Sequence, residues 1–306
     1  MKKCEKCSEP KRILGLWVVD YHSGSNSDFF EKPILNLGYE LDIVPITEFG
    51  CEARLAKQLV SKKYDLLIHV PYRNHPRPEF IRSIAGKTKT LAINGDDEWL
   101  WKDPNGTAKL AGFYDYCATS VPESKKRYDR LGQKALDFNW GYSSDWKPKN
   151  VEKKYDVYFC GQGNPRRDEY LNQIIDAGIR IKVDGPGYSG KIDFKEMINR
   201  YRMAKIGINF VTGEKDKFIY QQVKCRNFEV PAVKTFMLSE WCPALDRFFI
   251  SGEEIESFKT IPEAITKIQY YLRNDYEREA IATTGYERNK AYSFEKTLKR
   301  IFKEIL

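Results

Sequence analysis

The feature that most constrains the fold of this chain is the alternation of short apolar runs with amphipathic stretches. Ile13–Asp20 and Tyr64–Pro71 are apolar runs rich in Leu, Ile and Val, whereas Cys51–Lys62 repeats its apolar residues with a helical period. Buried strands that alternate with helices are typical of βα units wound into a parallel sheet. The sequence therefore predicts an α/β fold.

The alternation occurs twice, with a polar break at Ser143–Lys154 that has no periodicity and is typical of an interdomain linker. We therefore expect one Rossmann-like domain over residues 1–145 and another over 146–306. The expected strands are Ile13–Asp20, Glu40–Ile46, Tyr64–Pro71, Thr90–Gly95, Tyr116–Ser120, Ala135–Asn139, Tyr155–Gly161, Ile179–Asp184, Lys205–Val211 and Ala232–Leu238. The expected helices are Asp28–Leu37, Cys51–Lys62, Arg77–Ala85, Pro122–Leu131, Arg167–Ala177, Phe194–Met203, Gln222–Phe228, Pro262–Arg273, Tyr276–Ala291 and Phe294–Ile305.

Charge and cysteine content narrow the class of protein. The net charge of +8 is shared equally by residues 1–150 and 151–306, so it is a diffuse excess that suits anionic ligands such as nucleotide phosphates. Seven scattered cysteines favour reduced thiols and a cytoplasmic protein. No apolar run has the length of a membrane span, and the first residues lack a signal core. Cys4 and Cys7 have no second ligand pair nearby, so we expect no zinc site there.

The strongest local motif lies where an apolar strand ends in a Gly161-x-Gly163 turn and a helix begins. Glycines let an anion approach the backbone, and a helix N-terminus adds partial positive charge. Arg166 or Arg167 would add forked hydrogen bonds. The motif predicts a phosphate site built from exposed backbone amides, although an ordinary strand-to-helix turn with surface arginines remains the alternative.

A second cluster follows in the expected helix Gln222–Phe228. Gln222, Arg226 and Glu229 are spaced i, i+4 and i+7, which predicts that they share one helix face. A cation beside a carboxylate suits a nucleotide's diphosphate and ribose. A solvated surface ion pair is the alternative.

The sequence from Arg226-Asn-Phe-Glu229 through Met237-Leu-Ser-Glu240 to Phe248-Phe-Ile-Ser-Gly252-Glu-Glu254 resembles the C-terminal domain of GT-B glycosyltransferases. The similarity is closest to the CgeB-like (spore maturation protein) branch near glycosyltransferase family 4. The resemblance implies two Rossmann-like domains that face each other across a cleft and C-terminal helices, the last of which packs back on the first domain. It assigns the acceptor to residues 1–145 and the nucleotide-sugar donor to residues 146–306.

The resemblance also implies roles for individual residues. Glu229 matches the acidic residue that holds the donor ribose, and Arg226 and Lys224 match cations that neutralise the diphosphate. Gly161, Gly163 and Arg166 would form the loop beneath it, and Gly187 and Tyr188 follow the strand where such proteins bind the base. One position departs from the pattern, because Gln221 stands where retaining family 4 enzymes usually have a second glutamate.

The resemblance predicts transfer of a sugar from a UDP- or GDP-sugar to an acceptor hydroxyl, without a metal and without a resident cofactor. In the first half, Asp20, His22 and Asp96 lie in polar loops after expected strands and are candidates to deprotonate the acceptor. The acceptor would be a glycan, a protein or modified DNA. A non-catalytic nucleotide- or carbohydrate-binding protein with the same fold is the alternative function.

Overall fold

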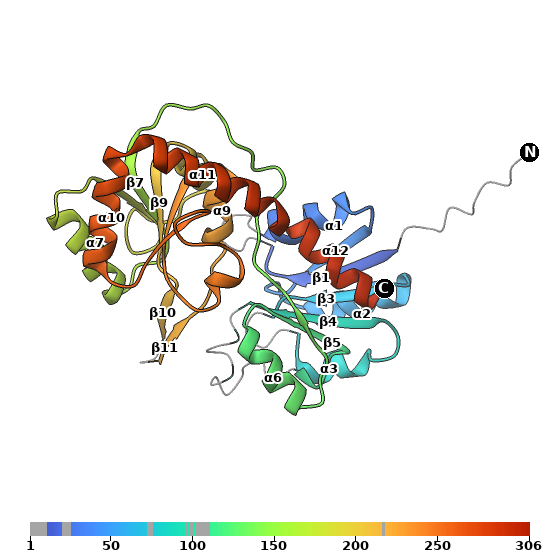
Figure 1. Cartoon of the computed structure of the whole chain (residues 1–306). Helices are drawn as coiled ribbons and strands as arrows, with labels where there is room; N and C mark the ends of the chain where they lie inside the picture. The colour runs from blue at the N-terminus through green and yellow to red at the C-terminus, as the bar shows by residue number, and fades with distance from the viewer. Residues whose placement is uncertain are drawn as a thin grey trace, which may run out of the picture. The chain divides into compact units, whose positions relative to one another are not determined.

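The computed structural model in Figure 1 describes residues 11–19, 26–71, 76–95, 97, 101, 111–215 and 218–306. The described residues form two compact units. Residues 11–19, 26–138 and 297–306 make up unit 1, and residues 139–296 make up unit 2. In the described part of the chain, no helix combines the length and the apolar character that crossing a membrane requires.

Unit 1 is built on a six-stranded parallel sheet with the order β2-β1-β3-β4-β5-β6. Its core is formed by apolar side chains such as Leu14, Leu67 and Ile81. The strands are β1 (Arg12–Trp17), β2 (Glu40–Pro45), β3 (Leu66–His69), β4 (Lys89–Asn94), β5 (Tyr116–Thr119) and β6 (Ala135–Asp137). The helices are η1 (Ser27–Glu31), α1 (Lys32–Asn36), α2 (Cys51–Ser61), α3 (Pro78–Ser83) and α6 (Pro122–Arg130), together with most of α12 (Phe294–Ile305).

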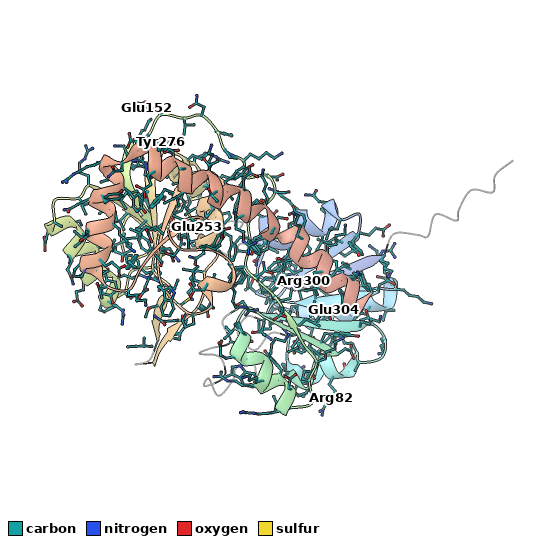
Figure 2. All side chains as sticks on the ribbon, viewed as in Figure 1. Arg82, Glu152, Glu253, Tyr276, Arg300 and Glu304 are labelled. Atoms are coloured by element: carbon teal, nitrogen blue, oxygen red, sulfur yellow. The ribbon has the colours of Figure 1, made fainter. Side chains whose placement is uncertain are left out.

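The end of the sequence contributes to the core of unit 1 through α12. Leu298, Ile301 and Phe302 are buried, and the Phe302 ring packs edge-on against Tyr39. Polar contacts hold the outer face of this helix. Arg300 and Glu304, labelled in Figure 2, reach the Asp137 carbonyl oxygen (3.1 Å) and the Lys134 ammonium (3.9 Å), respectively.

Unit 2 contains a five-stranded parallel sheet with the order β13-β12-β9-β7-β8. Because the chain winds in one direction from β7 to β8 and in the other from β9 onward, the carboxyl ends of β7 and β9 border the crevice where such sheets bind ligands. The strands are β7 (Tyr155–Cys160), β8 (Ile181–Asp184), β9 (Ala204–Asn209), β12 (Phe236–Glu240) and β13 (Glu256–Phe258). The helices are α7 (Pro165–Asp176), α8 (Phe194–Arg202), α9 (Arg226–Ala232), η2 (Leu245–Arg247), α10 (Ile261–Arg273), α11 (Asp275–Asn289) and η3 (Lys290–Tyr292).

The fold class predicted from the sequence is confirmed, but the region between β9 and β12 differs from the expectation. An antiparallel hairpin of β10 (Thr212–Lys215) and β11 (Phe218–Gln221) projects from unit 2 (Figure 1). The helix expected at Gln222–Phe228 begins only at Arg226, because the Gln222 amide still donates to the Val211 carbonyl at the base of the hairpin. The strand expected at Ala232–Leu238 begins at Phe236, since a left-handed turn at Lys234 (φ 58°) follows the helix.

The polar stretch Ser143–Lys154, which the sequence predicts to be a linker, has little regular structure, yet hydrogen bonds hold it against the rest of unit 2. The Arg202 guanidinium donates to the Lys147 carbonyl (3.1 Å). The Lys153 ammonium donates to the carbonyls of Arg202 and Ala204 (3.0 and 2.9 Å), and Trp146 is buried. This stretch is therefore part of the unit that follows it.

Candidate functional site

The candidate site lies at the carboxyl edge of the unit 2 sheet. Two helices begin there: α7 follows the end of β7, and α9 follows the hairpin that leaves β9. Edges of this kind gather loops and helix N-termini from several strands in one place. The site is therefore assembled from segments distant in sequence.

Two glycine loops pack against each other at this edge: the first, Gly161–Gly163, follows β7, and the second, Gly185–Gly187, follows β8. A Cβ on Gly185 would lie 2.2 Å from the Gly161 carbonyl oxygen, and a Cβ on Gly187 would lie 3.2 Å from the Gly163 Cα. Both Gly185 (φ 119°) and Gly187 (φ 94°) also adopt left-handed backbone that side chains disfavour. The glycines are thus required by close backbone contact.

The expectation of exposed amides in the first glycine loop is wrong. The Gly161 amide donates to the Asp184 carbonyl (2.9 Å), and the Gly163 amide donates to the Pro186 carbonyl (2.7 Å). Asn164 caps α7 by accepting a hydrogen bond from the Arg167 amide (2.9 Å). Because these groups are occupied, the affinity of the site for an anion has to come mainly from side chains.

Asp184 fixes the second glycine loop. Its side chain is fully buried, accepts a hydrogen bond from the Ser189 hydroxyl (2.6 Å) and forms ion pairs with Lys182 and Arg200. Burial alone would raise the pKa of this carboxyl group, but these donors outweigh it and lower the pKa. Asp184 therefore stays ionised and serves the conformation of the loop.

Three arginine side chains supply positive charge at the site. The guanidinium carbons of Arg167 and Arg226 each lie 5.9 Å from the centroid of the Phe159 ring, and the Arg166 guanidinium lies 3.8 Å from a carboxylate oxygen of Glu240. The Nε atoms of all three arginines are buried without a hydrogen-bond partner. Burial, and then the neighbouring charge of Arg226, lower the pKa of Arg167.

The absence of a side chain at Gly161 makes room for the Phe159 ring, over which Arg167 and Arg226 lie. A Cβ there would lie 2.8 Å from Cζ of Phe159 and in ordinary contact, at 3.4 Å, with Nη1 of Arg226. Within the described residues, no carboxylate lies within salt-bridge distance of Arg167 or Arg226. Two like-charged guanidinium groups with no carboxylate at salt-bridge distance are suited to a multiply charged anion such as a diphosphate.

Glu229 is buried, which contradicts the alternative of a solvated surface ion pair. Its side chain lies one helical turn after Arg226, and its Oε2 atom has no hydrogen-bond partner. Burial raises the pKa of Glu229 to about 7, although the charge of Arg226 opposes the shift. Gln222 does not share the helical face, since it precedes α9. A buried carboxylate with an unpaired oxygen is a ready acceptor for ligand hydroxyl groups.

The remaining predicted donor residues lie around the same loops. The Lys224 ammonium lies 4.9 Å from the centroid of the Tyr220 ring on the hairpin. The Tyr188 ring lies beside Gly163, and its hydroxyl donates to Asp168 (2.8 Å). Burial, followed by the hydrogen bond to Asp168, raises the pKa of Tyr188.

The residues predicted to deprotonate an acceptor belong to the first half of the sequence. Asp20, His22 and Asp96 lie outside the described residues, so they remain predictions. His69 is buried at the end of β3 and hydrogen-bonds the Tyr114 hydroxyl. Among the described residues, no cluster of three or more His, Cys, Asp or Glu side chains is arranged to hold a metal ion.

Sequence reasoning missed the polar groups beneath α9. Asn227 lies between the more conspicuous Arg226 and Glu229. It is fully buried and hydrogen-bonded to Asn209 and Ser239. A side-chain amide in the first turn of a helix inside an apolar segment was the available signal.

Residues 166–303 match the model of a family described as glycosyl transferase-like. No curated protein sequence matches the chain significantly.

Solved structures extend the similarity to both units. Sucrose-phosphate synthase from Thermosynechococcus elongatus has a TM-score of 0.67 at 11% identity, covering 96% of this chain and 98% of that chain. Anabaena HepE in complex with UDP-glucose has a TM-score of 0.66 at 8% identity, with coverage of 96% and 98%. TarM of S. aureus, in a complex with fondaparinux, alpha-GlcNAc-glycerol and UDP, has a TM-score of 0.59 at 12% identity, covering 83% of this chain and 57% of that chain. The chain therefore has the GT-B fold, with two Rossmann-like domains.

Proposed function

We propose that the chain is a glycosyltransferase that moves a sugar from a UDP- or GDP-sugar to an acceptor hydroxyl without a metal ion. The observation that carries the proposal is the pair of guanidinium groups at Arg167 and Arg226, which have no carboxylate at salt-bridge distance among the described residues, together with the buried Glu229, whose Oε2 atom has no hydrogen-bond partner. A nucleoside diphosphate has a group for each of these features: its charged phosphate chain suits the arginines, and its ribose diol suits Glu229.

The arrangement suggests how unit 2 would promote transfer. The bond between the sugar C1 and the diphosphate breaks with its electron pair on the phosphate oxygen, so positive charge near that oxygen lowers the barrier. Arg166, Arg167, Arg226 and Lys224 supply this charge, which replaces the need for a divalent cation. Glu229 accepts hydrogen bonds from the ribose, and Gly187 and Tyr188 border the base.

In this proposal the acceptor hydroxyl attacks C1, and one of Asp20, His22 or Asp96 takes its proton. Two similar structures support the substrate classes: HepE was solved with UDP-glucose, and TarM was solved with UDP and carbohydrate ligands. The resemblance of the segment around Arg226 and Glu229 to the CgeB-like branch points in the same direction.

The first test is donor binding by the Arg226→Ala variant. Loss of a charge-assisted hydrogen bond should weaken binding of UDP or GDP by about 1.5–3 kcal/mol, measured by isothermal titration calorimetry. Arg273→Ala is the matched control, because Arg273 is an exposed arginine at the end of α10. Full affinity in the Arg226→Ala variant would remove the donor-site assignment.

The second test separates an enzyme from a binding protein. The parent chain, mixed with a UDP-sugar or GDP-sugar and candidate acceptors, should release the free nucleoside diphosphate. Tight donor binding with no release for any acceptor would favour the non-catalytic alternative. A duplex containing hydroxymethylated bases belongs in the acceptor panel at low salt, since phosphate contacts weaken steeply as salt rises.

A further inference from the structure

Asn227 is the centre of a buried hydrogen-bond network under the first turn of α9. Its Oδ1 atom accepts hydrogen bonds from the Lys224 backbone amide and the Asn209 side-chain amide, each at 3.0 Å. Its Nδ2 atom donates to the Ser239 hydroxyl at 2.8 Å. The side chains of Asn209, Asn227 and Ser239 are all fully buried.

The network joins three segments at the carboxyl edge of the sheet. Asn209 is the last residue of β9, Ser239 lies near the end of β12, and Lys224 precedes α9. The bond from the Lys224 amide to the Asn227 side chain ties the residue before the N-cap Cys225 to the first turn of the helix. Asn227 therefore fixes where α9 begins relative to both strands.

The helix needs such support. It has seven residues, contains Pro231, and has no side-chain cap at Cys225. Helices this short have little stability of their own, because nucleation costs more than a few hydrogen bonds return. Lys224 and Arg226 lie at the start of this short segment, so their positions depend on how its first turn is held.

We propose that Asn227 is a positioning residue of the donor site, which holds the first turn of α9 so that Lys224 and Arg226 meet the diphosphate of a nucleotide. The inference rests on the proposed function. Asn227 itself touches no substrate in this proposal. It acts through the backbone of Lys224 and through the strands beneath the helix.

The test compares Asn227→Ala and Ser239→Ala with Asn289→Ala as the matched control. Asn289 is also fully buried, and its amide donates to the Phe228 carbonyl in the same helix (2.8 Å), but this bond does not involve the Lys224 amide. Binding of UDP, GDP and the corresponding nucleosides is measured by titration calorimetry at a temperature where every variant is folded by circular dichroism. If Asn227→Ala does not fold, Ser239→Ala, which removes only one partner of Asn227, carries the test.

Both test variants should bind the diphosphate at least about ten-fold more weakly, whereas their affinity for the phosphate-free nucleoside should change by less than about three-fold. Asn289→Ala should lower the melting temperature yet retain diphosphate affinity. Unchanged diphosphate affinity in the test variants, or an equal loss in Asn289→Ala, would overturn the positioning role alone. A parent protein that binds neither UDP nor GDP would overturn the proposed function and this inference together.

Discussion

At the residue scale, Glu229 links protonation, stability and ligand binding. Its pKa of about 7 lies above the ordinary value of 4.5, so the folded protein binds this proton more tightly than the unfolded chain does. The corresponding stability is complete below pH ~4.5 and is lost as the pH rises through 7. Glu229→Gln should therefore stabilise the protein at pH 8 by about 1–3 kcal/mol, and the gain should shrink toward pH 5, as measured by urea denaturation.

The same carboxyl group predicts how nucleotide binding responds to pH. Protonation removes a charged acceptor for the ribose, so the affinity of the parent for UDP should fall between pH 8 and pH 6. The terminal phosphate of UDP also titrates near pH ~6. The Glu229→Gln variant, which retains only the phosphate titration, is thus the control, and identical pH profiles for the two proteins would count against a role for Glu229 in binding.

Gly185 gives a second prediction at this scale. An alanine Cβ would lie 2.2 Å from the Gly161 carbonyl oxygen and would need a φ of 119°. Gly185→Ala should cost more than ~2 kcal/mol, because steric overlap adds to backbone strain. Gly178→Ala is the control, since it has a similar positive φ (77°) but open space around the new Cβ. Equal losses of stability would show that the packing of the two glycine loops does not matter.

At the scale of elements, the sequence predicted the strands and helices whose apolar period was sustained. The pattern at Cys51–Lys62 predicted α2 (Cys51–Ser61) to within one residue, and Tyr155–Gly161 predicted β7 equally well. The hairpin β10–β11 was missed because its strands are short, and its stability depends on contacts distant in sequence. The Thr212 amide and hydroxyl both donate to Glu240 (2.9 and 2.6 Å), which no local pattern encodes.

The candidate site, like the strands and helices, was predictable where a local sequence pattern indicates it and not where it depends on contacts distant in sequence. Residue types that suit phosphate, such as Arg166 and Arg226, stand out in the sequence. The burial of Glu229 and the occupation of the Gly161 amide depend on how the loops pack, which spacing along one helix does not reveal. The network around Asn227 likewise exists only because β9 and β12 are neighbours in the sheet.

The anchoring of the hairpin is testable. Thr212→Val keeps the shape of the side chain but removes the hydroxyl that donates to Glu240 and accepts from Gln221. A buried carboxylate then loses one donor, so we expect a destabilisation of about 1–3 kcal/mol. Hydrogen exchange should accelerate at the backbone amides of β10 and β11, while β7 should stay protected. Equal protection of the hairpin in parent and variant would show that it is held by other contacts.

At the scale of the whole molecule, unit 1 depends on a helix encoded after unit 2. The Phe302 side chain is buried in unit 1 against Tyr39, so Phe302→Ala should cost about 3–5 kcal/mol there. Hydrogen exchange read by mass spectrometry should show lost protection in β1 and β2, with β7 and β9 unchanged. Uniform loss of protection in both units would mean that they unfold as a single cooperative body.

The placement of α12 also has a consequence for biosynthesis. The ribosome synthesises residues 11–138 before unit 2. The core of unit 1 is nevertheless incomplete until Leu298, Ile301 and Phe302 emerge from the exit tunnel. Residues 139–296 leave the exit tunnel in between, and they already contain all the strands of their own sheet. Nascent domains generally fold as units once their chain is available. The segment translated second should therefore reach its native state first, and the segment translated first should wait, with its apolar surface open to chaperones, for the last helix.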